Sequence, residues 1–212
     1  MRDLPAVYPV LDVELALDRG FSALEIARIW LDEGVRFFQL RSKRLPGGAL
    51  LGLVEALTRE ARGAGALVIV NDRADLARMG GAAGVHVGQS DLSPVDARAV
   101  VGPEAFVGFS THNDDQVRRA LGEPVDYLAV GPVFATASKE RPDPVIGLEG
   151  VRSARATIGP AGRPLVAIGG ITLETARDVL AAGAASVAVI SDLFATDPRG
   201  RIREFLSLGQ RS

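Results

Sequence analysis

The chain has 212 residues, of which 47% are hydrophobic and 24% are charged, and its formal net charge is -2 at pH 7. This composition is that of an ordinary globular protein, and the length suits one α/β barrel domain over residues 1–212. The small negative net charge gives no overall basic field for nucleic acid, so nucleic-acid binding is disfavoured, and the lack of cysteine excludes disulfides and thiolate chemistry.

Membrane attachment and secretion are also disfavoured. No run approaches the roughly 18 consecutive apolar residues that suggest a membrane-spanning helix. The first residues, Met1 to Pro5, begin no signal peptide. We therefore expect a cytoplasmic protein that binds neither nucleic acid nor a membrane, and a homodimer is compatible with this composition.

Short apolar runs alternate with helical patterns along the chain. The apolar runs predict strands at residues 6–11, 35–40, 66–70, 84–87, 105–109, 125–130, 164–168 and 186–190. Helices are predicted at residues 22–32, 49–62, 74–79, from 94 onwards, and at 114–121, 148–158, 173–182 and 199–208. Strands that are continuously apolar, each followed by a helix, predict a parallel (β/α)8 TIM barrel. A doubly wound open sheet is the alternative.

The second predicted strand ends in three spaced polar side chains. Gln39, Arg41 and Lys43 alternate with other residues, so all three project from one face if the strand continues to Lys43. Two cations and an amide aimed at one point suit a small polyanion such as a diphosphate. A solvated strand end that limits aggregation is the alternative.

Polar residues and glycines follow most of the other predicted strands. In chain order they are Asn71 and Asp72; Asp91; Ser110 and His112; Thr136, Ser138 and Lys139; Gly169 and Gly170; and Ile190 and Ser191. In a barrel these positions meet at the carboxyl ends of the strands, where active sites lie. Aspartates beside a polyphosphate favour Mg²⁺. The last two pairs follow strands seven and eight, where backbone N–H groups commonly bind a phosphate.

The longest irregular stretch, residues 131–147, follows the sixth strand and is longer than most strand-to-helix connections. It contains Thr136, Ser138 and Lys139. We expect it to close over a bound diphosphate, with Lys139 making a contact that the open state lacks.

Several of these residues also have purely structural interpretations. Asp72 can cap the helix that begins at Ala74, and Gly169–Gly170 can be only a tight turn. His86 lies inside an apolar strand, where a hydrogen-bonded core histidine is favoured over a base. No glutamate stands at a strand terminus, so the proton-abstracting carboxylate of a sugar-phosphate isomerase is missing.

Eight short motifs occur in order from about the second strand to the eighth. They are Gln39-Leu-Arg-Ser-Lys43, Asn71-Asp-Arg73, Gly84-Val-His-Val-Gly-Gln-Ser-Asp91, Ser110-Thr-His112, Gly131-Pro-Val-Phe-Ala-Thr-Ala-Ser-Lys139, Gly147-Leu-Glu-Gly150, Ala167-Ile-Gly-Gly170 and Val189-Ile-Ser191. Each motif is weak alone, but their order at successive strand ends is specific. Taken together, they resemble the thiamine-phosphate synthases.

The resemblance implies a reaction and a set of roles. The diphosphate of 4-amino-2-methyl-5-hydroxymethylpyrimidine leaves, and the nitrogen of hydroxyethylthiazole phosphate replaces it. By resemblance, Gln39, Arg41, Lys43, Asn71 and Lys139 hold the pyrimidine diphosphate, Asp72 and Asp91 bind Mg²⁺, Ser110 lies near the pyrimidine, and Thr136, Ser138, Gly170, Ile190 and Ser191 surround the thiazole phosphate. Among these, Lys139, Ser110, Arg41 and Lys43 are the expected catalytic residues.

One position departs from the family pattern, because Ser138 stands where Thr is more usual; the hydroxyl is kept. Two alternatives to the synthase remain. The sister thiazole tautomerases typically carry a catalytic histidine directly after the glycine that ends strand six, where this chain has Pro132. A non-catalytic phosphate-binding barrel is the other.

Overall fold

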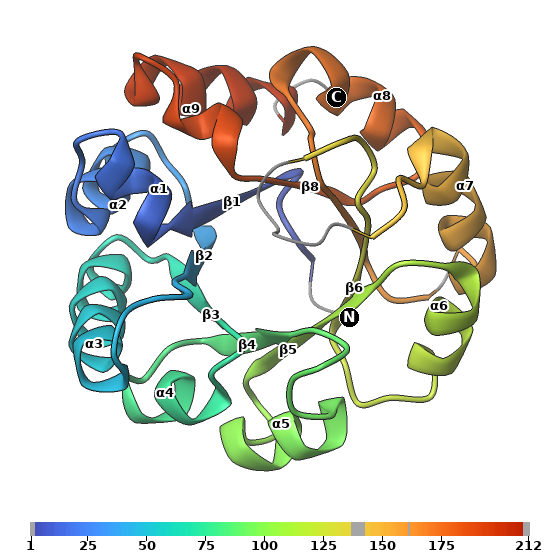
Figure 1. Ribbon diagram of the computed structural model, residues 1–212, viewed down its shortest axis with the longest axis horizontal. Coiled ribbons are helices and arrows are strands. Elements are labelled where there is room, and N and C mark those ends of the chain that lie inside the picture. The colour runs from blue at the N-terminus through green and yellow to red at the C-terminus, as the bar shows by residue number, and fades with distance from the viewer. Residues whose placement is uncertain (1–2, 137–142, 161, 210–212) are drawn as a thin grey trace.

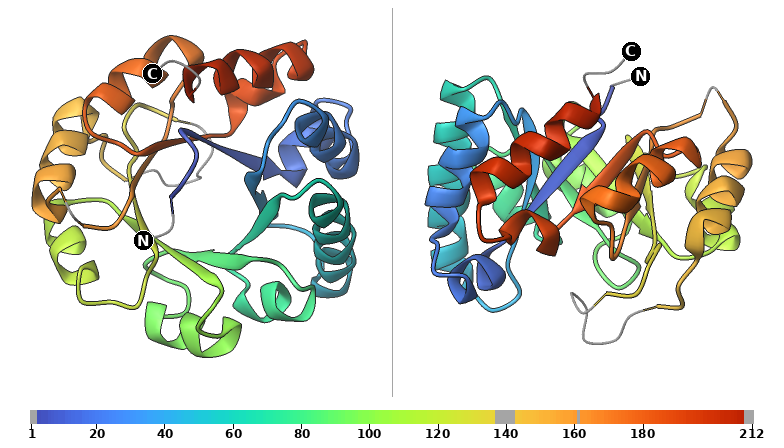
Figure 2. Two further views of the ribbon diagram at one scale, coloured as in Figure 1. Left: turned by 180° about the vertical axis from the view of Figure 1, so that it is seen from behind. Right: turned by 90° about the horizontal axis from the view of Figure 1, so that it is seen from above.

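The structure, a computed structural model, describes residues 3–136, 143–160 and 162–209 and contains a closed barrel of parallel strands in chain order. The barrel closes where the last strand pairs with the first, with Val7 opposite Val187 and Pro9 opposite Val189. Helices surround the strand ring on its outside (Figures 1 and 2). The prediction of a (β/α)8 TIM barrel is therefore confirmed, and the open-sheet alternative is wrong.

The elements have the following bounds. The strands are β1 Val7–Asp12, β2 Phe37–Arg41, β3 Leu67–Asn71, β4 Gly84–Val87, β5 Phe106–Thr111, β6 Tyr127–Val130, β7 Leu165–Ile168 and β8 Ser186–Val189. The α-helices are α1 Val13–Asp18, α2 Ala23–Asp32, α3 Gly47–Gly63, α4 Ala74–Met79, α5 Pro94–Val101, α6 Asp114–Ala120, α7 Gly147–Ile158, α8 Leu173–Ala181 and α9 Pro198–Leu206. Two 3₁₀ helices, η1 Ser191–Phe194 and η2 Ser207–Gly209, complete the set.

Two short helices were not predicted. The first, α1, begins directly after β1 because the Asp12 carboxylate accepts a hydrogen bond from Leu15 N, which caps the helix. With only six residues, α1 is too short to produce a recognisable helical period. The second, η1, begins at Ser191, directly after the last strand. Both lie at the carboxyl ends of their strands, beside the pockets described below.

Apolar side chains fill two layers. The larger layer lies between the strands and the helices, as expected of strands that are buried on both faces. The smaller one fills the inside of the barrel. Two tyrosines, Tyr8 and Tyr127, belong to this inner layer, with ring centroids 5.9 Å apart in an edge-to-face arrangement. Their hydroxyls place polar atoms within this mainly apolar layer, where they meet the buried side chains of Gln39 and His86.

One glycine makes room for these polar groups. A Cβ atom on Gly108 of β5 would lie 2.1 Å from Cζ of Tyr127 and 2.4 Å from Nδ1 of His86. We expect Gly108→Ala to lower the free energy of unfolding by about 1 to 3 kcal/mol, the usual cost of overpacking a core. Thermal unfolding tests this. Gly63→Ala is the matched control, because its Cβ would meet no atom within 4 Å. A Gly108→Ala melting temperature equal to that of the control would contradict the packing described.

No helix in the described ranges is both long enough and apolar enough to cross a membrane.

Candidate active site

Two adjoining pockets open at the carboxyl ends of the strands. The inner pocket is lined by Tyr8, Val10, Gln39, Arg41, Asn71, His86, Ser110, Thr111, His112, Ala129, Gly131, Pro132, Thr136, Val166, Ile168, Gly169, Gly170, Ile171, Ala188, Ile190 and Ser191. The outer pocket adds Asp12, Glu14, Leu15, Asp18, Arg19, Lys43, Arg44, Asp72, Gly88, Gln89, Ser90, Asp91, Gln116 and Asp143. The inner pocket is thus largely apolar, and the outer pocket is strongly charged.

The residues predicted from the sequence converge on these pockets. Gln39, Thr136 and Gly170 line the inner pocket, and Lys43, Asp72 and Asp91 line the outer one. Those that line both are Arg41, Asn71, Ser110, Ile190 and Ser191. The remaining two, Ser138 and Lys139, lie outside the described residues, as does the central part of the predicted closing loop.

The end of β2 differs from the prediction. The strand stops at Arg41, and Lys43 lies in the bend that follows. Lys43 therefore does not share a strand face with Gln39 and Arg41. Arg41 forms an ion pair with Asp12, which is only 6% exposed. Lys43 instead reaches Asp72, with Nζ 2.5 Å from Oδ2. The two cations therefore face the pockets from different backbone segments, each held by an aspartate.

Glu14 of α1 explains why the chain leaves the strand. Its carboxylate accepts hydrogen bonds from Ser42 Oγ at 2.6 Å, Lys43 N at 3.2 Å and Arg44 N at 3.0 Å. Partial burial raises the pKa of Glu14, but the bonds from Ser42, Arg44 and Lys43 outweigh it and lower the pKa overall. The ionised carboxylate thus fixes the bend that carries Lys43.

Asp72 and Asp91 form a carboxylate pair in the outer pocket. Asp72 has a left-handed backbone, with φ at 61°, and its N–H donates to the carbonyl of His86. Asp91 accepts a hydrogen bond from Gly88 N at 2.8 Å. Burial and then the neighbouring Asp72 carboxylate raise the pKa of Asp91. The alternative that Asp72 caps α4 is wrong, because the cap residue is Arg73 and no side chain caps that helix.

This pair fits a magnesium ion. Carboxylate oxygens are the ligands that Mg²⁺ prefers, and it is usually held by one or two of them together with substrate phosphates and water. Within the described ranges no three acidic, histidine or cysteine side chains gather closely enough to enclose a metal. The donor set therefore fits an ion shared with a phosphorylated substrate better than a closed protein cage.

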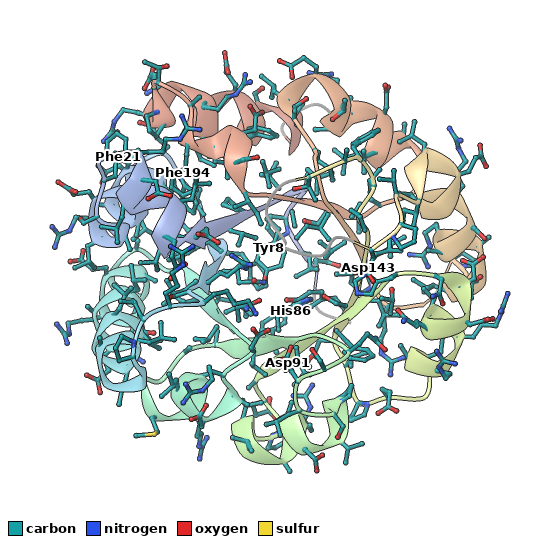
Figure 3. The ribbon with its side chains drawn as sticks, in the orientation of Figure 1. Tyr8, Phe21, His86, Asp91, Asp143 and Phe194 are labelled. Atoms are coloured by element: carbon teal, nitrogen blue, oxygen red, sulfur yellow. The ribbon has the colours of Figure 1, made fainter. Side chains whose placement is uncertain are left out.

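His86 lines both pockets, is 8% exposed and lies inside the ring of strands (Figure 3). Its Nδ1 is 3.1 Å from the Tyr127 hydroxyl and its Nε2 is 2.8 Å from Ser110 Oγ. The Tyr127 hydroxyl also lies 2.9 Å from that of Tyr8, which accepts a hydrogen bond from Gln39 Nε2 at 3.1 Å. The expectation of a hydrogen-bonded core histidine therefore describes His86 well. Burial raises the pKa of both tyrosines, so both hydroxyls keep their hydrogens at neutral pH.

The turn after β7 is constrained by its neighbours. Gly169 and Gly170 both have positive φ, at 104° and 63°. A Cβ on Gly169 would lie 2.6 Å from Pro132 Cα, and one on Gly170 would lie 2.5 Å from the carbonyl oxygen of Ala135. The two glycines therefore let the segment after β6 pack against the turn. They form a tight turn and also line the inner pocket.

The sequence predictions did not single out Asp12, Glu14 and Tyr8, which line the pockets, or Tyr127, which is hydrogen-bonded to Tyr8. Asp12 ends the first strand, so the rule that located the other strand-end residues also applies to it. Glu14 follows it in the unpredicted helix α1. Tyr8 and Tyr127 lie inside apolar strands, where a tyrosine is indistinguishable from any other core aromatic.

Comparisons with known proteins agree on one family. The family model described as thiamine monophosphate synthase matches residues 7–193. A thiamine-phosphate synthase of Koribacter versatilis (strain Ellin345) is 47% identical over 207 residues, covering 97% of this chain and 96% of the relative. One from Methanoculleus marisnigri is 44% identical over 185 residues, covering 87% of this chain and 85% of the relative.

A solved structure agrees as well. Thiamine phosphate pyrophosphorylase from Pyrococcus furiosus superimposes with a TM-score of 0.84 at 30% identity, covering 97% of this chain and 96% of that one. Because the family model and two relatives well above 30% identity span most of the chain, the chain belongs to the thiamine-phosphate synthase family and is a transferase of that type.

Proposed function

We propose that the protein couples 4-amino-2-methyl-5-hydroxymethylpyrimidine diphosphate with hydroxyethylthiazole phosphate to give thiamine phosphate and diphosphate. The observation that carries this proposal is the division of the site into a charged pocket and an apolar pocket that share Arg41, Asn71 and Ser110. A flat heteroaromatic ring fits the inner pocket, where Gln39 and Ser110 can meet its polar atoms, and its diphosphate then extends towards Lys43.

The bond changes require little proton chemistry. The bond between the pyrimidine methylene carbon and the diphosphate oxygen breaks, and the oxygen keeps the electron pair. The lone pair of the thiazole nitrogen then forms the new carbon–nitrogen bond, and no proton is removed. Arg41 and Lys43 stabilise the charge that develops on the departing diphosphate. A dissociative path of this kind needs no strong general base.

Asp72 and Asp91 are the residues that would hold Mg²⁺ in this scheme, and the ion would neutralise charge on the leaving diphosphate. The second phosphate, that of the thiazole, is assigned to Gly170, Ile190 and Ser191, which follow β7 and β8, where barrels commonly bind phosphate. Ile190 and Ser191 also line the outer pocket, so the two anionic groups are assigned to neighbouring parts of the site. Thr136 lines the inner pocket and is assigned to the thiazole phosphate as well.

Product analysis tests the reaction. Chromatography after mixing both substrates with Mg²⁺ should reveal thiamine phosphate, and either substrate alone should give none. Conversion of a thiazole tautomer without ligation would instead identify a tautomerase. Two unchanged substrates would identify a non-catalytic barrel.

Lys43→Met tests the assignment of the outer pocket. Loss of one charged hydrogen-bond donor should raise the KM for the pyrimidine diphosphate or lower kcat by roughly 10-fold, because such bonds are worth about 1.5 to 3 kcal/mol and Lys43 is partly exposed. Thiazole phosphate binding, measured by calorimetry, should hardly change. Equal weakening of both ligands would contradict the assignment.

A further inference from the structure

A continuous chain of hydrogen bonds crosses the barrel beneath the pockets. It runs from Gln39 on β2 through Tyr8 and Tyr127 to His86, and from there to Ser110 on β5. Both tyrosines are at most 1% exposed. Gln39 and Ser110, the two ends of this hydrogen-bond chain, line the inner pocket, where substrate is expected, as do Tyr8 and His86.

The hydrogens of this chain can be counted from its first link. The amide nitrogen of Gln39 faces Tyr8 and can only donate, so the Tyr8 oxygen accepts. The Tyr8 hydroxyl hydrogen then goes to the Tyr127 oxygen, and that of Tyr127 goes to Nδ1 of His86. A neutral imidazole that accepts at Nδ1 carries its hydrogen on Nε2. This hydrogen points at Ser110 Oγ.

The reverse order leaves a donor unpaired. If Tyr127 donated to Tyr8, the Tyr8 oxygen would receive two hydrogens, and its own O–H would have no acceptor within this chain. A buried donor without a partner is costly, which favours the first order. Two further features hold this hydrogen-bond chain in place. Gly108 has no side chain, which leaves room for Tyr127 and His86 together. In addition, Gln89 Nε2 donates a hydrogen bond to the Ser110 carbonyl at 2.6 Å.

We propose that His86 is a positioning residue whose Nε2–H bond makes the Ser110 hydroxyl a hydrogen-bond donor to a ring nitrogen of the pyrimidine. The Ser110 oxygen accepts from His86, so its own hydrogen is directed to the pocket. The site would therefore select a ring that offers an acceptor nitrogen at this point. The part that concerns the pyrimidine rests on the proposed function; the tautomer of His86 does not.

Nuclear magnetic resonance of the histidine ring nitrogens tests the tautomer directly. The chain has only two histidines, so the spectrum of a ¹⁵N-histidine sample is simple, and His112→Gln identifies the signals of His86. We expect His86 in the free protein to be neutral with its hydrogen on Nε2. A ring that carries hydrogen on Nδ1, or one that exchanges between both forms, overturns the proposal. The tautomer is measured on the unaltered protein, the variant serves only to identify the signals, and no substrate is added, so the result is independent of the reaction.

A mutant cycle tests the link to Ser110. Ser110→Ala and His86→Leu should each lower kcat/KM for the pyrimidine diphosphate by about 10- to 100-fold, the range for one lost buried hydrogen bond. The double variant should lose no more than the larger single loss, because His86 acts only by orienting the bond that Ser110 makes to the pyrimidine. His86→Gln should recover most of the activity, since its amide can accept from Tyr127 and donate to Ser110. Additive losses, or a glutamine variant as poor as leucine, would contradict the positioning role.

Discussion

The Arg41→Met variant is expected to lose about 100-fold in kcat/KM for the pyrimidine diphosphate and about 3 kcal/mol in the free energy of unfolding. The first effect follows because a charged donor to the leaving group disappears. The second follows because the Asp12 carboxylate, whose side chain is 8% exposed, would remain buried without a cation to balance its charge. Steady-state kinetics and denaturant unfolding measure the two effects separately.

A second substitution separates these two roles. Adding Asp12→Asn to Arg41→Met removes the unpaired charge, while the asparagine side chain can still accept the cap bond from Leu15 N. The double variant should therefore regain much of the lost stability and none of the lost activity. Recovery of activity along with stability would mean that Arg41 acts only through the fold.

Asp91→Asn should have opposite effects on activity and on stability. With one carboxylate ligand lost, the Mg²⁺ concentration for half-maximal activity should rise roughly 10- to 100-fold. The melting temperature of the metal-free protein should rise by about 1 to 2 °C at neutral pH, since surface substitutions usually change stability by about 0.5 kcal/mol. Metal titrations of activity and thermal unfolding test both statements.

The sign of the stability change follows from the raised pKa of Asp91. A carboxyl with a higher pKa in the folded protein binds its proton more tightly there, so ionising it costs stability as the pH rises above the value for the unfolded chain. The gain from Asp91→Asn should therefore be present at neutral pH and vanish in acid, where the carboxyl is protonated in both states. Asp178→Asn, an exposed aspartate on α8, is the control. Wild-type metal dependence in Asp91→Asn would make Asp91 a turn residue only.

The barrel and most of the site could be predicted because both depend on local patterns. Eight apolar strands with intervening helices define the fold, and the residues of the candidate site then follow from their positions at strand ends. Arg41 and Asp72 were found in this way. The course of the chain at Lys43 could not be, because it depends on Glu14, which lies 29 residues earlier in the sequence.

The buried hydrogen-bond chain could not be predicted from the sequence for a related reason. Tyr8 and Tyr127 are 119 residues apart, and neither differs in pattern from an apolar strand residue. Only closure of the barrel brings β1 and β6 close enough for the two hydroxyls to meet. The role of Gly108 could not be predicted either, because a side chain at this position would clash with Tyr127, which lies on the neighbouring strand.

Simultaneous time courses of diphosphate release and thiamine phosphate formation test the central claim most directly. With both substrates and Mg²⁺ present, the proposed reaction predicts that the two products appear together in equal amounts, and that chelating the metal stops both. Diphosphate release without thiamine phosphate would show hydrolysis, and no release at all would show that the pockets bind these substrates without reaction or do not bind them. Either result would contradict the proposed function.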